Sequence, residues 1–388
     1  MNICILAPRY PFPENGGDVL RLNQVARYLK ARDHRLTLVA FRQTDITVPD
    51  VEHLYDEIIT VHRNRWFAAF HIITGLFRGQ PMQRGYYLSR DYAKAFRRII
   101  ANRHFDLFIS HLVRMIPYLE DNNLCHRSIV EMTDALSKTY ELAIRAQGGG
   151  LLKYIYMVER GLIKRYEQYV IEKFPKVVLV SADDIALLNQ GHAHSSLCLF
   201  PNGVNLNPSP SVSYDCNKIT FIGNMRTLQN SDAVVHFARN IFPLILRERP
   251  DAVFQIVGNQ PSPAVRALAC DNIIVTGFVE NLNAVIADSC VVVAPVRVAA
   301  GIQNKVLVAM ANRLPIVLSS LISRAIPELH DGSNCFICDA DRDFASACLR
   351  IMADDSLRNR LAANGYEMVR QHYSWDAKLS GYELLPCQ

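Results

Sequence analysis

One stretch of the chain decides the fold: residues 218–259, "KITFIGNMRTLQNSDAVVHFARNIFPLILRERPDAVFQIVGN". The runs at 218–224 and 252–259 are short, apolar and typical of buried strands, whereas residues 231–250 repeat apolar side chains at helical spacing. A strand, a helix and a second strand in this order predict two parallel strands joined by a crossover helix. The stretch therefore predicts an α/β fold.

The same alternation continues on both sides. We expect further strands at 2–8, 35–41, 105–111, 127–134, 176–184, 272–279, 290–296, 314–320 and 335–339. Residues 200–215 are rich in Pro, Asn and Ser and lack periodicity, which is typical of a linker. The sequence thus predicts two doubly wound, Rossmann-like domains, at 1–200 and 216–371, with a linker at 201–215. Ligands are expected in the cleft between two such domains, at the carboxyl ends of the strands.

The length and composition agree with two domains, and the cysteine content indicates the redox environment of the protein. The chain has 388 residues, half of them hydrophobic, which is more than one ordinary core needs. Its ten cysteines show no disulfide framework, which is typical of a reducing cytosol. The pair Cys335 and Cys338 in "CFIC" could belong to a redox or zinc motif. Zinc would need a second pair, however, and we favour a buried strand.

The first half of the chain favours contact with an anionic membrane or a polyanionic substrate. Residues 1–200 carry 26 Lys/Arg against 20 Asp/Glu, whereas residues 201–388 carry 16 against 17. Nucleic acid is the weaker alternative, because the basic residues are dispersed. The N-terminus lacks the basic region and cleavage site of a signal peptide.

The longest apolar run, Trp66–Phe77, is too short to span a bilayer. It is flanked by Arg63, Arg65 and Arg78. This pattern is typical of a helix lying on a membrane surface, with aromatic side chains in the lipid and arginines at the headgroups. A helix that faces the protein core is the equally weighted alternative.

Three loops in the second half follow strands and carry small or amide residues. Their candidate residues are Gly223, Asn224 and Arg226; Gly277, Phe278 and Val279; and Gly301, Ile302, Gln303, Asn304 and Lys305. Backbone N–H groups at a helix N-terminus bind phosphate, and a glycine lets the phosphate approach. Any doubly wound domain has such loops, but a series of them predicts a phosphate-bearing ligand, with Arg226 and Lys305 as its cations.

These segments resemble a known family. "GNMRTLQNSDAVVHF", "VTGFVENL", "APVRVAAGIQNKVLVAMANRLPIVLSS" and "AIPELHDGSN" are similar to the nucleotide-sugar domain of glycosyltransferase family 4, especially the sugar transferases of bacterial exopolysaccharide clusters. In the first half, "PFPENGGDVLRLNQVARYL", "EMTDALSKTYELA", "VSADDIALL" and "FPNGVN" also match, as does "YSW" near the end. The resemblance implies a GT-B fold, two domains facing across a cleft, and a terminal helix at 372–388 that crosses back to the first domain.

The resemblance also implies an activity. A sugar would move from a nucleotide diphosphate donor to a glycan or a polyprenyl-linked acceptor, with retention at the anomeric carbon and without an obligatory metal or other cofactor. The process would be cell-surface polysaccharide synthesis. We therefore expect a cytoplasmic protein, or one held peripherally at the inner face of the plasma membrane.

Roles for the second-half residues follow from the resemblance. Arg226 and Lys305 would stabilise the charge on the leaving phosphate, with Gly301, Ile302 and Gln303 as backbone donors. Gly277–Val279 would border the nucleotide base. Glu328 lies in the family's "PE" element and would either face the cleft or orient a loop.

In the first half, Gly16 and Gly17 would let a loop approach the diphosphate or the acceptor. Asp18 and Arg21 begin the next helix and are either functional or simple caps and surface charges. His111 ends a strand; it either contacts the reacting sugar, as in related enzymes, or is structural.

Two polar residues of the family pattern are missing. The family has a glutamate at the position of Val308, where it accepts hydrogen bonds from the donor ribose, and Ala300 replaces a Glu or Arg. Losing a hydrogen bond to a charged group weakens binding by about ten- to hundredfold. Another residue could hold the ribose, the enzyme could be slow or use an unusual donor, or the domain could be a non-catalytic partner of another transferase.

Two other enzyme classes are less well supported. A sugar-nucleotide epimerase of GT-B fold would need acidic residues in the cleft, and the "GIQNK" and "IPELHDG" elements favour a transferase. A dinucleotide-dependent oxidoreductase would need GxGxxG after the first strand, which "PENGGD" does not supply.

Overall fold

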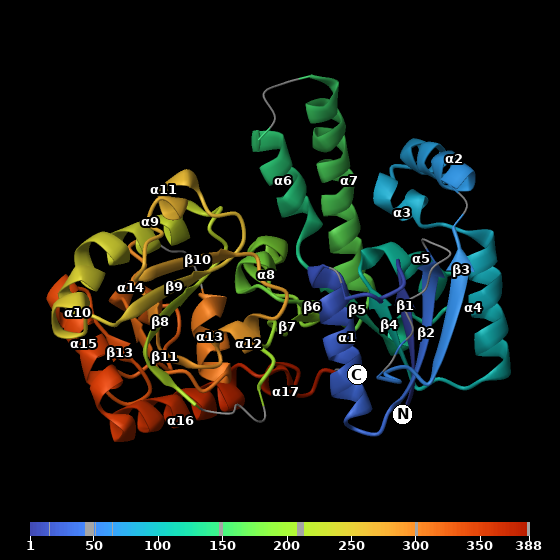
Figure 1. Ribbon diagram of the computed structural model, residues 1–388. Helices are drawn as coiled ribbons and strands as arrows, with labels where there is room; N and C mark the ends of the chain where they lie inside the picture. The colour runs from blue at the N-terminus through green and yellow to red at the C-terminus, as the bar shows by residue number, and fades with distance from the viewer. Residues whose placement is uncertain are drawn as a thin grey trace. The chain divides into compact units, whose positions relative to one another are not determined.

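The chain divides into two structural units of similar α/β construction (Figure 1). A computed structural model describes residues 1–14, 16–42, 50, 52–63, 65–146, 150–207, 213–298 and 302–385. The first unit comprises Met1–Asn202 together with Lys378–Gln388, and the second comprises Gly203–Ala377.

A seven-stranded parallel sheet forms the centre of the first unit, in the order β3-β2-β1-β4-β5-β6-β7. The strands are β1 (Asn2–Ala7), β2 (Arg35–Arg42), β3 (Glu57–His62), β4 (Leu107–His111), β5 (Ser128–Thr133), β6 (Lys176–Leu179) and β7 (Leu197–Leu199). Helices cover both faces, so the central strands are continuously apolar rather than alternating. The strand order reverses between β1 and β4, which makes their carboxyl ends the expected binding edge.

The helices of the first unit connect these strands. They are α1 (Gly17–Lys30), α2 (Arg65–Phe77), α3 (Met82–Tyr86), α4 (Arg90–Asn102), α5 (Ile116–Glu120), α6 (Leu136–Ala146), α7 (Leu151–Lys173) and α8 (Ala182–Asn189). Two 3₁₀ turns, η1 (Val113–Met115) and η2 (Cys125–Arg127), precede α5 and β5. In the described parts of the chain, no helix combines the length and the hydropathy needed to cross a bilayer.

The second unit has a six-stranded parallel sheet in the order β10-β9-β8-β11-β12-β13. The strands are β8 (Asp215–Ile222), β9 (Val253–Val257), β10 (Ile273–Gly277), β11 (Ser289–Ala294), β12 (Ile316–Leu318) and β13 (Phe336–Ile337). The buried strand predicted around "CFIC" is confirmed by β13, with Cys335 fully buried beside it. Among the described residues, no group of three or more His, Cys, Asp and Glu is arranged to hold a metal ion.

Helices again separate the strands of the second unit. They are α9 (Leu228–His236), α10 (Phe242–Glu248), α11 (Pro263–Arg266), α12 (Leu282–Ile286), α13 (Asn304–Ala311), α14 (Ser320–Ser323), α15 (Asp341–Ala353), α16 (Asp355–His372) and α17 (Trp375–Lys378). A π-helical turn, η3 (Phe237–Ile241), joins α9 to α10. The predicted helix at 372–388 is represented by α17 alone, and turns follow it.

Candidate active site

The loop after β8 is held against the end of β9 by direct backbone contact. Gly223 N–H donates to the Val257 carbonyl at 2.9 Å, and Met225 N–H donates to the Asn259 carbonyl at 3.0 Å. A Cβ atom on Gly258 would lie 1.6 Å from the Gly223 oxygen, so only glycine permits this approach. The loop that carries Asn224 and Arg226 is thereby positioned at the carboxyl edge of the sheet.

Lys305 is the buried cation of this edge. It lies in the first turn of α13, its ammonium group contacts Asn230 Oδ1, and its Nζ lies 4.7 Å from the centre of the Phe221 ring. The Asn230 amide in turn donates to the Asn224 carbonyl at 2.9 Å. Burial lowers the pKa of Lys305 to about 8. In the described part of the chain no carboxylate pairs with it, which leaves the charge of the ammonium available to an external anion.

The other cation, Arg226, has an exposed side chain on the β8–α9 loop. Its backbone N–H is fixed by Asn224 Oδ1 at 3.0 Å, whereas its guanidinium makes no hydrogen bond or ion pair with the described residues. Ala300 and Gly301 lie outside the described residues. Of the α13 loop, Ile302 and Asn304 are exposed and Gln303 is the buried N-cap residue.

The residues expected near the base lie at the end of β10. Gly277 has a left-handed backbone (φ 71°) and its carbonyl accepts from Gly258 N–H at 3.2 Å. This bond joins the β10 end to the β8 and β9 ends. Phe278 is 71% exposed, which leaves its ring face free to stack on a planar ligand, and Val279 is half-buried against the core.

Val308 lies one turn after Lys305 on α13 and is half-buried against apolar residues. One further turn along, Asn312 donates from Nδ2 to the Val308 carbonyl at 2.9 Å and to Asn283 Oδ1 at 3.1 Å. Spacings of three and four place Lys305, Val308 and Asn312 on one helix face. On this face of α13, where the family resemblance predicts a carboxylate that accepts hydrogen bonds from the ribose, the chain has the apolar Val308 between Lys305 and Asn312.

Glu328 binds within its own unit. Its Oε2 accepts a hydrogen bond from the Tyr373 hydroxyl at 2.6 Å, and its carbonyl accepts from Asn334 Nδ2 at 2.9 Å. The Tyr373 contact connects the "PE" element to the residue that follows α16, and the Asn334 contact connects it to the loop before β13.

In the first unit, His111 ends β4 at the point where the strand order reverses. Its side chain is 2% exposed, and neither ring nitrogen makes a hydrogen bond with any described residue. The next residue, Leu112, has a left-handed backbone (φ 65°), a strain that often marks functional positions. A buried imidazole with two unused nitrogens is able to accept or donate one hydrogen bond to a ligand.

The glycine loop lies at the same carboxyl edge. Gly16 has φ 111°, and a Cβ there would lie 2.8 Å from the Arg9 guanidinium. That guanidinium pairs with Asp18, whose Oδ2 lies 3.0 Å from Arg9 Nε. Although burial acts to raise it, the pKa of Asp18 is lowered by Arg9. Gly17 has open space around its Cα.

The interpretation of Arg21 as a cap or surface charge is wrong. Arg21 is 1% exposed, and its Nη2 lies 3.3 Å from Glu131 Oε2 at the end of β5. The same carboxylate accepts from the Tyr382 hydroxyl at 2.8 Å, and Arg21 Nη1 donates to the Pro201 carbonyl at 3.1 Å. Arg21 thus joins helix α1, the end of the first domain and the returning C-terminal segment.

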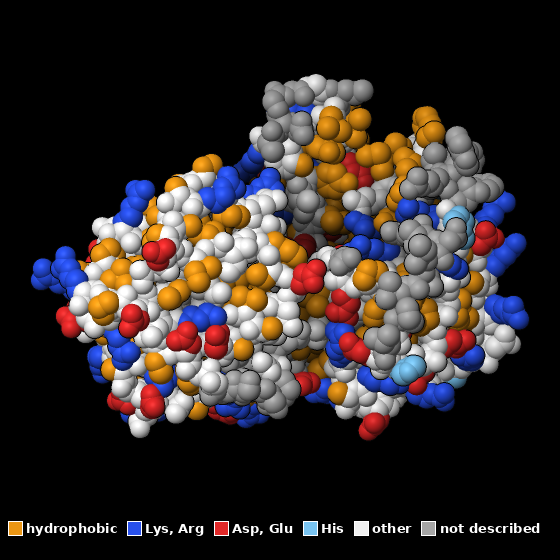
Figure 2. Space-filling view, viewed as in Figure 1, with side chains coloured by type: hydrophobic (Ala, Val, Ile, Leu, Met, Phe, Trp, Pro, Cys, Tyr) orange, Lys and Arg blue, Asp and Glu red, His pale blue; other side chains and the backbone are white. Residues whose placement is uncertain are grey.

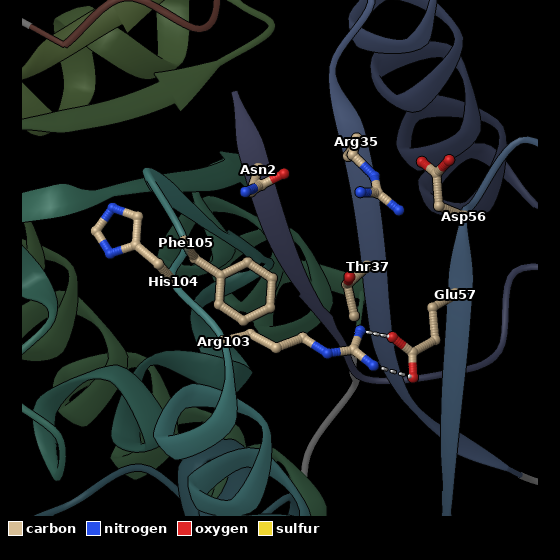
Figure 3. A pocket seen from close by; sticks show the side chains of 8 residues that line it. All are labelled: Asn2, Arg35, Thr37, Asp56, Glu57, Arg103, His104 and Phe105. Atoms are coloured by element: carbon tan, nitrogen blue, oxygen red, sulfur yellow. Dashed lines mark hydrogen bonds and ion pairs between the residues drawn. The ribbon is translucent and has the colours of Figure 1, made fainter.

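A further cavity of the first unit lies at the opposite edge of the sheet (Figure 3). It has a volume of about 570 Å³ and is formed where β1, β2 and β3 begin. Two of its charged side chains pair with each other, Arg103 with Glu57, and a third, Asp56, pairs with Lys30. His111 and the glycine loop lie at the other edge, where the carboxyl ends of the strands meet and where parallel α/β sheets generally bind ligands.

The pKa of His111 has a consequence for stability. Burial, reinforced by Arg21, Arg114 and Arg9 but opposed by Asp18, lowers this pKa to about 4. An unfolded histidine takes up its proton near pH 6.5, so the neutral folded form is disfavoured as the pH falls below that value. At pH 5 we expect a loss of about 2 kcal/mol in the free energy of unfolding.

Urea unfolding at pH 7 and pH 5 measures this loss, with His111→Gln as the comparison. The glutamine variant should lack the His111 contribution to the pH dependence. An equal pH dependence in both proteins would contradict the buried neutral imidazole.

Comparisons with known proteins bear on the family and the fold. Residues 216–354 match the family model described as Glycosyl transferases group 1. A protein of Klebsiella pneumoniae described as "Uncharacterized 44.6 kDa protein in cps region" is 20% identical over 386 residues, 96% of each chain.

Solved structures show the same two-unit fold. HepE of Anabaena in complex with UDP has a TM-score of 0.57 at 14% identity, covering 97% of each chain. A TarM variant of S. aureus, in complex with UDP and α-GlcNAc-glycerol among other ligands, has a TM-score of 0.56 at 11% identity, covering 98% of this chain and 99% of TarM. The chain therefore has the GT-B fold, and its residues 216–354 match a glycosyl transferases group 1 domain.

Proposed function

We propose that this protein is a retaining glycosyltransferase that moves a sugar from a nucleotide diphosphate donor to a glycan or polyprenyl-linked acceptor in cell-surface polysaccharide synthesis. The observation that carries the proposal is Lys305, a buried ammonium that contacts a neutral amide at the carboxyl edge of the second sheet. HepE with bound UDP and the relative in a cps region support the donor class and the role.

Transfer requires stabilisation of the leaving diphosphate. The bond from the anomeric carbon to the phosphate oxygen breaks with its electron pair on that oxygen. A bond from the acceptor hydroxyl oxygen to the same carbon forms, and the hydroxyl proton passes to the departing phosphate. Lys305, the N-terminus of α13 and Arg226 supply positive potential where this charge develops, so the step needs no metal.

His111 is proposed to bind the substrate sugar. Its low pKa keeps the imidazole neutral at physiological pH, so it can accept a hydrogen bond from a sugar hydroxyl on one nitrogen and donate from the other. Phe278 is proposed to stack on the nucleotide base, since its ring is exposed beside Gly277.

A panel of nucleotide sugars tests the function directly. Binding to the folded state raises the unfolding temperature in proportion to ligand occupancy, and slow hydrolysis of the donor reports the bond cleavage. We expect one donor to stabilise the protein and to be hydrolysed, and expect both effects to be strongly reduced in Lys305→Met. Stabilisation without hydrolysis or transfer would indicate the non-catalytic partner, and failure of every nucleotide sugar to stabilise the protein would contradict the proposal.

Val308→Glu is expected to tighten nucleotide binding by about tenfold, because a carboxylate on this face of α13 accepts hydrogen bonds that valine cannot accept. Calorimetric titration with the nucleoside diphosphate measures the change. Val308→Gln is the matched control, since it adds length and polarity without charge and should gain less. Unchanged or weaker binding by Val308→Glu would exclude a ribose site at this helix.

A further inference from the structure

The outer half of the α6–α7 hairpin is apolar but uncovered. Residues 151–158, "LLKYIYMV", contain a single charged side chain, and none of residues 152–158 is buried. Farther along α7, by contrast, Ile163 and Val170 are buried in the first unit. A helix that is apolar around its circumference normally lies inside a protein or against lipid. The outer half therefore lacks the cover that its sequence calls for.

The exposed side chains of the hairpin are large. Tyr154 is 65% exposed, Leu142 59% and Met157 54%, and Leu152 and Val158 are also exposed. Figure 2 shows hydrophobic side chains gathered over the outer part of α7. An exposed apolar patch of this kind on a folded domain marks a surface that binds a partner or a membrane.

A second apolar patch lies at the end of α2. Phe77 is 89% exposed and Ile73 is 57% exposed, so this end of the predicted helix does not face the core. Helix α3 packs against α2, and its Met82 N–H donates to Glu159 of α7 at 2.9 Å, so α3 links the two helices that carry the patches. The α2–α3 pair and the α6–α7 hairpin project from the same end of the first unit (Figure 1). Helices α2 and α6 also follow the carboxyl ends of β3 and β5, the edge of the sheet where His111 lies.

The charges around these patches are positive. Arg145 and Arg160 are exposed on the hairpin, Lys153 lies between its apolar residues, and Arg78 follows Phe77. The acidic Glu141 is paired with both Arg145 and Arg160, at 2.7 and 3.5 Å.

Two other carboxylates of α7 face inward. Glu159 Oε2 accepts from Met82 N–H at 2.9 Å, and Glu167 Oε1 accepts from Ser137 N–H at 3.1 Å. The outward charge of this surface is therefore cationic, which suits an anionic partner.

We propose that the outer α6–α7 hairpin and the end of α2 dock on an anionic lipid bilayer. Two separate apolar patches on projecting helices fit a fluid, conforming surface better than a rigid protein face. Lys153, Tyr154 and Tyr156 among the apolar residues would place their polar ends at headgroup depth while their apolar parts enter the acyl region. The inference rests on the proposed function and narrows it: the acceptor is a lipid-linked glycan, presented from the membrane to the edge of the sheet that carries His111.

Flotation of the full chain with phosphatidylcholine vesicles, with and without phosphatidylglycerol, tests the surface. We expect binding only to the anionic vesicles, weaker at high salt, and reduced by about tenfold or more in L152S/M157S and in F77S. Lys153→Glu should weaken binding at low salt. The matched control is L187S/L199S, which removes two exposed leucines elsewhere on the same unit and should bind as the wild type does.

Donor hydrolysis without vesicles, measured on the same variants, separates this proposal from the proposed function. If the patch variants hydrolyse the donor normally but no longer bind vesicles, the result supports both the docking surface and the proposed function. Vesicle binding without any hydrolysis by the wild type retains the docking surface and rejects the enzyme. Docking is overturned if the wild type ignores anionic vesicles, if L152S/M157S binds them normally, or if that variant instead converts a dimer to a monomer in the absence of lipid.

Discussion

Lys305→Met is expected to lower donor turnover by about a hundredfold to a thousandfold, the cost of losing one preorganised charge that stabilises a developing anion. The variant should remain folded, and even gain stability, because it removes an ammonium that is buried beside a neutral amide. Steady-state turnover of the donor and the unfolding temperature together measure the effect. Arg360→Met is the control, since it removes an exposed positive charge from α16 in the same unit.

The pH dependence distinguishes a phosphate-binding ammonium from a merely structural one. With its pKa near 8, Lys305 loses its proton as the pH rises through that value, so nucleotide binding should weaken above about pH 8. The stability of the ligand-free protein should instead increase as the pH rises. The folded pKa lies below the unfolded value of 10.5, so the free energy of unfolding rises between pH 8 and pH 10.5. A nucleotide affinity that stays constant across pH 8 would argue against Lys305 as the phosphate ligand.

Arg21→Met is expected to destabilise the first unit by about 3–5 kcal/mol, because it leaves Glu131 buried without its partner. The returning segment should loosen as well, since Tyr382 shares that carboxylate. Urea unfolding measures the first effect, and hydrogen exchange at the backbone amides around Tyr382 measures the second.

Arg27→Met is the matched control on the same helix. Arg27 pairs with Glu14 and Glu52 but is partly exposed, so its loss should cost no more than about 1 kcal/mol. The double variant R21M/E131L should recover most of the lost stability, because both buried charges are then absent. Equal losses from Arg21→Met and Arg27→Met would mean that the buried pair has no special role.

Some strands could not be predicted from periodicity. β3 (Glu57–His62) and β7 (Leu197–Leu199) went unrecognised because both are edge strands that are largely not buried, and β7 is also short. The burial that makes β1 or β11 uniformly apolar is therefore missing. The end of α2 shows the reverse. Ile73 and Phe77 have the composition of a core helix, yet both are exposed in the described part of the first unit.

The sequence alone determined the two α/β units and the loops that carry the candidate residues, because strand burial and glycine conformation are local properties that leave a periodic trace. Only the tertiary structure decided which partners the charged side chains have and whether those side chains are buried. The sequence left Arg21 either functional or a cap or surface charge, and the structure places it beside Glu131, 110 positions away. Lys305 gained its low pKa from burial next to Asn230, 75 positions away. Partners so distant in the chain meet only when the sheet is assembled, and solvation of a charge depends on that neighbourhood rather than on adjacent residues.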